Sequence, residues 1–160
     1  MPHDLVIRVA GAGDIAAVAS LRLAWGDPGG DHHDAAPGFE RHLAEWIATE
    51  GDRRTIWLAE LNNQPVGMST LYEFRRMPRP GRMDSRWGYL GNMFVRADRR
   101  NQGVGSALLS AVIDAAQERR YARVVLSPTA RSVPFYRRAG FVDADGAASE
   151  RLLMRPIRLS

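Results

Sequence analysis

The sequence predicts an α/β fold: a single domain spanning residues 1–160, with a mixed β-sheet flanked by helices. The chain has 160 residues, of which 45% are hydrophobic and 25% charged, as expected for one soluble domain. Two strand patterns joined by a polar turn at Asn62-Asn63-Gln64 predict an antiparallel hairpin. A strand, a helix and a second strand within residues 87–126 predict a βαβ unit with parallel strands, which makes the sheet mixed.

The chain begins with a strand pattern and two helix patterns. Residues 5–9 alternate like a strand, and residues 14–25 follow a helical period, with Asp14 well placed near the helix start. Residues 26–38 are rich in Gly, Pro and Asp and predict a loop, after which residues 39–50 resume the helical period. Three tryptophans at apolar positions are expected in the core, namely Trp25, Trp46 and Trp57.

The central part of the chain contains the hairpin and most of the βαβ unit. Residues 55–60 and 65–74 are the two hairpin strands. Residues 75–86 contain five arginines, two prolines and one glycine, and they predict a long basic loop. Residues 87–95 predict the next strand, and residues 103–120 predict an amphipathic helix.

The last part of the chain predicts short elements. An apolar stretch at residues 123–126 is the second strand of the βαβ unit. Ser132 is placed to cap a short helix, which tolerates Pro134 in its first turn and ends at Gly140. Two closing strands and the turn between them are expected at residues 141–142, 152–157 and 145–148.

The composition excludes several classes of protein. Because the chain contains no cysteine, disulfide frameworks, thiolate metal sites and cysteine nucleophiles are excluded, and a reducing cytoplasm fits. No apolar run reaches membrane-spanning length and the N-terminus lacks a signal-peptide pattern, so we expect a cytoplasmic protein without a membrane partner. The pair His32-His33 beside Asp34 is the nearest approach to a metal site, but adjacent side chains point apart, and no metal is expected.

All 22 cationic side chains are arginines, and the net charge is +4. Arginine binds phosphate groups bidentately, so this composition suits a polyphosphate ligand or a nucleic acid. The arginines are scattered along the chain and mixed with acidic residues. The charge therefore permits a phosphate ligand without identifying one, and nucleic acid is not expected as a partner.

A glycine-containing loop, Arg100-Asn101-Gln102-Gly103-Val104-Gly105, stands between the strand at 87–95 and the helix that follows. Its glycines allow a sharp turn and close approach of the backbone to a ligand. The helix start adds unpaired amides and the positive end of the dipole, and Arg100 adds a full charge. A dinucleotide motif would need a third glycine where Leu108 stands, and a Walker loop would need lysine. The loop therefore predicts a different phosphate site.

Two motifs together resemble those of a known family. The first is Arg100, Gly103 and Gly105 after the strand segment Met93-Phe94-Val95, and the second is Pro134-Phe135-Tyr136 through Gly140-Phe141, some 30 residues further on. This pattern resembles the GNAT superfamily of acetyl-CoA-dependent N-acetyltransferases. The resemblance covers nearly the whole chain in element order. It implies a GNAT-like sheet that is splayed at its centre, within one acetyltransferase domain over residues 1–160.

The resemblance also implies which residues bind acetyl-CoA as the co-substrate. The amides from Gln102 to Ser106 would hold the pyrophosphate. Phe94 and Val95 would offer their strand backbone to the acetyl carbonyl and the pantetheine arm. Ser127 or Thr129 would replace an asparagine that many members carry near the pantetheine. The full expected set is Met93, Phe94, Val95, Arg100, Asn101, Gln102, Gly103, Val104, Gly105, Ser106 and Thr129.

The resemblance assigns catalytic roles less completely. Gly91-Asn92 lies where the family carries a strand bulge, a geometry that suits this pair. Tyr136 falls at the position of the general acid, and a phenol of pKa about 10 is protonated at neutral pH. Asn92 cannot act as a base. Glu73 on the hairpin strand is the first candidate for the base, and Asp84 and Asp27 are the next.

The function implied is direct transfer of the acetyl group to a primary amine of an unidentified small-molecule or peptide acceptor. Homodimers are frequent in the family, so the resemblance also allows a homodimer. Two alternatives remain at this point. A non-catalytic acyl-CoA-binding regulatory domain would keep the phosphate loop and need no acid, and a nucleic-acid-binding module would use the arginines of residues 75–86.

Overall fold

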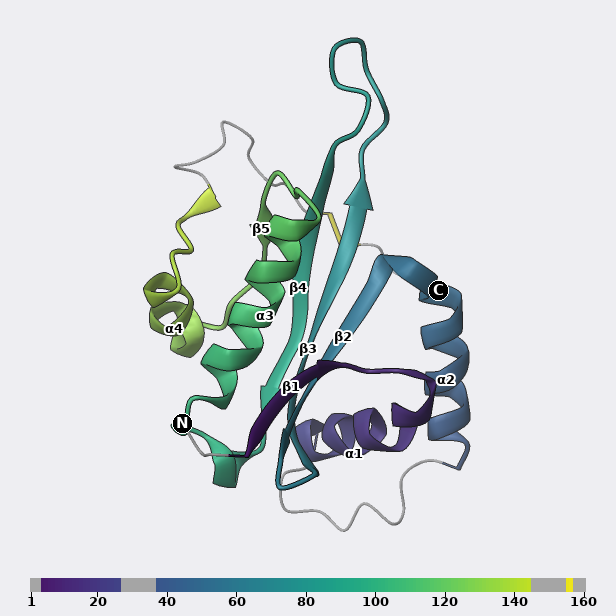
Figure 1. Ribbon diagram of the computed structural model, residues 1–160, viewed down its shortest axis with the longest axis vertical. Helices are drawn as coiled ribbons and strands as arrows, with labels where there is room; N and C mark the ends of the chain where they lie inside the picture. The colour runs from purple at the N-terminus through teal and green to yellow at the C-terminus, as the bar shows by residue number, and fades with distance from the viewer. Residues whose placement is uncertain (1–3, 27–36, 145–154, 157–160) are drawn as a thin grey trace. The chain divides into compact units, whose positions relative to one another are not determined.

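The computed structural model describes residues 4–26, 37–144 and 155–156 of the chain (Figure 1). The chain divides into two compact units, residues 1–126 and residues 127–160. The first unit contains a β-sheet and three of the α-helices, and the second contains one short helix. Among the described residues, no helix is long and apolar enough to cross a membrane.

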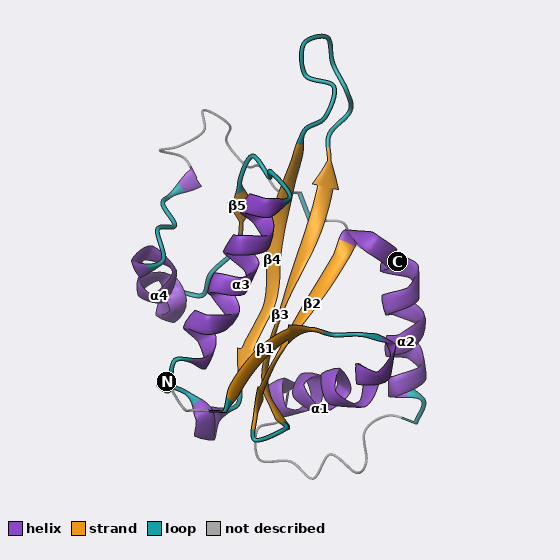
Figure 2. Ribbon diagram, viewed as in Figure 1, coloured by secondary structure: helices purple, strands orange, loops and turns teal. Residues whose placement is uncertain are grey.

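The first unit is built on a five-stranded sheet whose strands lie side by side in chain order (Figure 2). The strands are β1 (Leu5–Val9), β2 (Arg54–Leu61), β3 (Gln64–Arg75), β4 (Arg86–Val95) and β5 (Val124–Val125). Neighbours from β1 to β4 pair antiparallel, and β5 pairs parallel with β4. The predicted mixed sheet and the predicted βαβ unit are therefore confirmed.

The hairpin between β2 and β3 turns through two asparagines. Asn62 and Asn63 have φ angles of 51° and 61°, and Leu61 pairs directly with Gln64. Asparagine tolerates this left-handed region better than most residues, and two successive left-handed residues give the turn type that matches the twist of paired strands. The predicted hairpin is confirmed, with Gln64 as the first residue of the second strand.

Helices cover both faces of the sheet. On one face, α1 (Ile15–Gly26) places Val18 and Leu21 in a core cluster with Met68 of β3, and α2 (Phe39–Glu50) adds partly buried side chains to it. On the other face, α3 (Val104–Glu118) lies so close that a side-chain carbon at Gly67 would be 3.1 Å from Leu108 Cδ1. Because neighbouring strand residues point to opposite faces, α1 and α3 lie on opposite sides.

The expectation that three tryptophans lie in the core is correct for one of them. Trp57 is only 5% exposed, whereas Trp25 and Trp46 are 38% and 37% exposed. Both exposed rings lie beside an arginine: the Arg22 guanidinium is 4.9 Å from the Trp25 ring centroid, and that of Arg54 is 5.1 Å from Trp46. An indole ring that stacks with a cation is stable at the rim of a core, so an apolar helix position alone did not distinguish rim from interior.

The carboxylate of Asp14 ties the start of α1 to the sheet. Arg8 of β1 donates two hydrogen bonds of 2.8 Å to Asp14 and two more to Glu60 of β2. Asp14 also accepts a 2.7 Å hydrogen bond from the Gly11 amide, so it closes the turn before α1, which itself begins at Ile15. The hydrogen bonds from Arg8, then that from Gly11, lower the pKa of Asp14 from 3.8 to about 2.

We expect this lowered pKa to make stability depend on pH. Folding favours the charged form of Asp14, so its contribution is present above pH 3.8 and is lost as the pH falls toward about 2. Asp14→Asn should lower the free energy of unfolding by roughly 1–2 kcal/mol at pH 7 and by much less near pH 2. Urea unfolding of both proteins at the two pH values measures this difference. An equal difference at both pH values would contradict it.

The second unit contains α4 (Val133–Arg138), which ends in a glycine-dependent cap. Gly140 has a φ angle of 92°, its amide donates to the Arg137 carbonyl, and the Phe141 amide donates to the Tyr136 carbonyl. The Phe141 ring also packs edge-on against the Tyr136 ring at 5.7 Å. These paired hydrogen bonds with an apolar contact form a Schellman motif, which ends the helix at the predicted glycine.

Two expectations for this unit are wrong. Residues 141–142 form no strand, because Phe141 is used by the helix cap and Val142 is 74% exposed. Ser132 does not cap α4 with its side chain, because its hydroxyl donates to the Thr129 carbonyl at 3.0 Å. The expected turn at 145–148 and most of the expected strand at 152–157 lie outside the described residues, as does most of the loop at 26–38.

Candidate active site

Strand β4 carries a bulge at its centre. Met68 of β3 pairs with Phe94, and Thr70 pairs with Gly91, so a single residue of β3 lies opposite two residues of β4. The extra residue is in the segment Asn92–Met93, and Asn92 has a φ angle of 50°. The Thr70 hydroxyl lies 3.1 Å from the Gly91 carbonyl and 3.1 Å from Asn92 Oδ1. The bulge expected at Gly91-Asn92 is therefore present.

Beyond the bulge, β4 has a free edge toward β5. The two strands pair only at Gly88 with Val124 and at Tyr89 with Val125. Residues 91–95 continue β4 without a strand partner on that side among the described residues. The central splay of the sheet is thereby confirmed, and the backbone of Met93, Phe94 and Val95 is left able to bind a ligand.

The loop after β4 turns sharply into α3. Asn101 and Gly103 have φ angles of 59° and 83°, and Gly103 is the N-cap residue. The Gln102 side chain donates to the Asp98 carbonyl at 3.3 Å, which closes the loop on itself. Arg100 donates from Nε to the Val95 carbonyl at 3.1 Å, so its guanidinium is held against the end of β4.

The amides of this loop are distinguished by their hydrogen bonding. Among the described residues, none accepts a hydrogen bond from the amides of residues 101–106, whereas the Ala107 amide donates to the Gly103 carbonyl. Unpaired amides at a helix start, together with the helix dipole, attract an anion. A cavity of about 180 Å³ lies beside the loop and is lined by Ala24, Phe94, Arg96, Ala97, Asp98 and Arg100. The end of β4 and the loop therefore lie beside one cavity with Arg96 and Arg100 in its lining, an arrangement that suits an anionic ligand.

An exposed tryptophan lies next to this site. The Trp25 ring, at the end of α1, stacks on the Phe94 ring with centroids 5.7 Å apart and planes 13° apart. It therefore covers the face of β4 opposite α3, at the residue that follows the bulge. Beyond an apolar residue at a helix end, no sequence pattern indicated this contact.

Glu73 does not lie at the bulge. It pairs with Gly88, on the part of β4 that precedes the free edge. Its carboxylate is buried and accepts 2.6 Å hydrogen bonds from the Tyr121 hydroxyl and from Arg75 Nε. Burial raises the pKa of Glu73, but the hydrogen bonds from Tyr121 and Arg75 outweigh it and lower the pKa below its ordinary value. Of the other candidate bases, Asp84 is paired with Arg86, and Asp27 is outside the described residues.

Tyr136 lies on α4 in the second unit. Its ring packs edge-on against Phe135, with centroids 5.0 Å apart, as well as against Phe141. Burial raises the pKa of the Tyr136 phenol above 10.0, so the hydroxyl is protonated at neutral pH. Thr129, also in this unit, lies with its hydroxyl 3.1 Å from that of Ser132.

Comparison with known proteins identifies the family. A model described as the acetyltransferase (GNAT) family matches residues 13–141. The chain belongs to the GNAT acetyltransferase family. The match includes the bulge, the amide-bearing loop and Tyr136, and this member is thus an N-acetyltransferase family enzyme. A comparison with curated proteins found no match.

Solved GNAT-like structures share the fold. A predicted acetyltransferase from Clostridium acetobutylicum, solved with acetyl-CoA, is 23% identical, with 94% of this chain and 96% of that chain covered and a TM-score of 0.70. Glucosamine-6-phosphate N-acetyltransferase from Arabidopsis thaliana is 14% identical, with 97% and 99% covered and a TM-score of 0.72. An acetyltransferase from Trypanosoma brucei is 22% identical, with 98% and 99% covered and a TM-score of 0.71.

Proposed function

We propose that this GNAT member transfers the acetyl group of acetyl-CoA directly to a primary amine. One observation carries the proposal: the amides of residues 101–106 have no acceptor among the described residues. These amides follow the edge of β4 that has no strand partner there. The amides from Gln102 to Ser106 would bind the pyrophosphate, and Arg100 would add positive charge. Met93, Phe94 and Val95 would bind the acetyl and pantetheine groups along the strand. The acetyl-CoA bound in the Clostridium relative supports the choice of ligand.

The catalytic unit in this proposal is one domain formed by residues 1–160. The family match at residues 13–141 extends across the boundary between the two compact units, at residues 126 and 127. The amides belong to the first unit and Tyr136 belongs to the second. Thr129, four residues before Val133 of α4, would contact the pantetheine arm.

The reaction begins with attack of the neutral amine on the thioester carbonyl. The tetrahedral intermediate carries an oxyanion, which a backbone N–H of the β4 edge would stabilise. The carbon–sulfur bond then breaks, and the thiolate of CoA takes a proton from the Tyr136 hydroxyl as the amide product forms. The raised pKa of Tyr136 favours the protonated phenol that this step requires.

A base must take a proton from the amine. An alkylamine of pKa about 10.4 is almost wholly protonated at pH 7, and exposing its lone pair costs roughly 4–5 kcal/mol. Glu73 remains our sequence-based proposal for this base, reached through water or after release of one of its two hydrogen bonds. Asn92, which carries no basic group, would instead orient the acceptor at the bulge.

Glu73→Gln tests this role. Because a neutral amide replaces a buried carboxylate that is hydrogen-bonded to Tyr121 and Arg75, we expect the free energy of unfolding to fall by about 1–3 kcal/mol. As the base, Glu73 would also contribute roughly 10²-fold to kcat with alkylamines and little with weakly basic amines. Chemical unfolding and kcat for both amine classes separate the two effects. A destabilised variant with unchanged kcat would refute the assignment as base.

The proposed function is tested with the purified protein, acetyl-CoA and a panel of primary amines. Free thiol release is followed by absorbance, and the acetylated amine is identified by mass spectrometry. We expect thiol release that requires an amine and matches amide formation mole for mole. Calorimetric binding of CoA without amine-dependent thiol release would favour the regulatory acyl-CoA-binding alternative over the enzyme.

A further inference from the structure

The basic loop expected at residues 75–86 is present, and it takes the form of a hairpin arm between β3 and β4. This basic arm, residues 75–86, continues β3 and β4 beyond the rest of the sheet (Figure 1). The Arg76 amide donates to the Ser85 carbonyl, and Arg79 and Arg82 exchange two backbone hydrogen bonds of 3.1 and 2.8 Å. Pro80 and Gly81, with a φ angle of 78° at Gly81, make the turn between them. Proline followed by a left-handed glycine is typical of a type II turn, so the arm holds a defined shape.

The arm carries five arginines and one acidic residue. Arg75 is paired with Glu73 and Asp52, and Arg86 is paired with Asp84. The other three arginines of the arm are Arg76, Arg79 and Arg82. They are exposed and have no carboxylate partner among the described residues. The outer part of the arm is thus a positively charged surface, and no carboxylate of the described residues neutralises its charge.

Two methionines lie between these arginines and are unusually exposed. Met77 is 89% exposed and Met83 is 74% exposed. Methionine side chains are apolar and adaptable, and they are over-represented on protein surfaces that bind other proteins. The arm has no aromatic residue on which a nucleic acid base could stack. The combination of cations with thioethers therefore favours an acidic protein segment over a nucleic acid.

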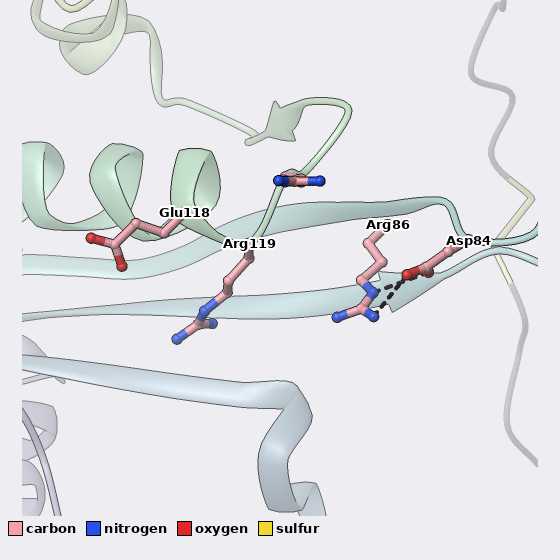
Figure 3. A pocket seen from close by; sticks show the side chains of 5 residues that line it. Asp84, Arg86, Glu118 and Arg119 are labelled. Atoms are coloured by element: carbon pink, nitrogen blue, oxygen red, sulfur yellow. Dashed lines mark hydrogen bonds and ion pairs between the residues drawn. The ribbon is translucent and has the colours of Figure 1, made fainter.

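A cavity at the base of the arm continues the same surface. It has a volume of about 450 Å³ and is lined by Asp84, Arg86, Glu118, Arg119 and Arg120. Asp84 and Arg86 come from the arm and are hydrogen-bonded to each other, while Glu118 and Arg119 come from the end of α3 (Figure 3). Arg120 has a φ angle of 54° and no ion pair among the described residues. The cavity thus offers a cation and space for an acidic side chain.

We propose that the basic arm is the docking surface for an acidic, partly apolar segment of a protein partner. Carboxylates of the partner pair with Arg76, Arg79 and Arg82, its apolar side chains contact Met77 and Met83, and a further carboxylate enters the cavity at the base of the arm. This inference goes beyond the proposed function and does not depend on it, because docking requires neither acetyl-CoA nor turnover.

The test measures fluorescence anisotropy of a labelled short peptide of alternating glutamate and leucine, added to the full-length protein at low salt. The arm variant combines Arg76→Gln, Arg79→Gln and Arg82→Gln. The matched control combines Arg41→Gln, Arg53→Gln and Arg138→Gln, which removes the same charge from exposed positions elsewhere. We expect the arm variant to bind about tenfold more weakly, the control to lose less than about twofold, and added salt to weaken binding to the native protein.

Further probes distinguish the chemistry of the partner. A glutamine and leucine peptide should bind at least about tenfold more weakly than the acidic peptide, because it has no carboxylates. The double variant Met77→Ser with Met83→Ser should bind the acidic peptide about threefold more weakly. Thermal unfolding and CoA affinity establish that each variant is folded. Equal losses in the arm and control variants, no binding of the acidic peptide, or tighter binding of oligo(dT) than of the peptide would each overturn the proposal.

Discussion

Replacing Tyr136 with phenylalanine is expected to lower kcat by roughly 10²- to 10⁴-fold and to leave the Kd for CoA within about twofold. The change removes only the hydroxyl that we propose as the proton donor, because the ring that packs against Phe135 and Phe141 is kept. The thiolate of CoA must then leave without a proton from the protein. Thiol release at saturating acetyl-CoA and amine gives kcat, and isothermal titration with CoA gives Kd.

Tyr72→Phe is the matched control for this experiment. It also removes one phenol and keeps the ring, which lies under the Arg54 guanidinium at 4.7 Å, away from the amide-bearing loop. We expect this control to keep kcat within about twofold, since the Tyr72 hydroxyl has no role in the proposed mechanism. A Tyr136→Phe protein with native kcat would remove Tyr136 from the mechanism and leave the leaving group to be protonated by water.

Replacing Gly103 with valine is expected to weaken CoA binding by about 100-fold. Gly103 is the N-cap residue of α3 and has a φ angle of 83°, where a β-branched residue is strained by roughly 1–2 kcal/mol. Relief of that strain would turn the neighbouring amides away from the anion. The loss of two charge-assisted hydrogen bonds accounts for the expected factor, which isothermal titration with CoA measures directly.

Gly13→Val provides the comparison for this variant. Gly13 lies in the turn before α1, with no left-handed φ angle and no heavy atom within 4 Å of the position that a side-chain carbon would occupy. The same substitution there should leave the Kd for CoA unchanged. If Gly103→Val were folded by circular dichroism and bound CoA like the native protein, the pyrophosphate would have to lie elsewhere, and the proposed function would lose its main support.

Local patterns predicted most of the sheet and the long helices. The two asparagines at 62 and 63 identified a tight hairpin, and the strand, helix and strand of the βαβ unit fixed the parallel pair. The errors concern surroundings that a local pattern does not show, such as the exposure of Trp25 and Trp46 or the use of a residue by a neighbouring turn. Phe141 looks like part of a strand, but its amide closes α4. The basic loop was predicted, and only the backbone pairing of Arg79 with Arg82 within it was not.

The candidate site was predictable where it depends on chain-local geometry. The glycine and asparagine of the loop determine its left-handed turns, and their spacing is visible in the sequence. The surroundings of Glu73 were not predictable, because its donor Tyr121 is 48 residues away and meets it only through the packing of α3 on the sheet. Trp25 likewise reaches Phe94 only because α1 crosses that face of β4.

The bulge in β4 has a consequence for the orientation of every later residue of that strand. Side chains alternate along a strand, so one inserted residue reverses which way the remainder faces. Phe94, opposite Met68, points toward α1; if the same residues paired regularly, without the bulge, Met93 would take that position and Phe94 would point toward α3. The extra residue therefore determines which way the final third of the strand faces, and deletion of one residue within 91–93 would restore regular pairing while Phe94 kept its place opposite Met68.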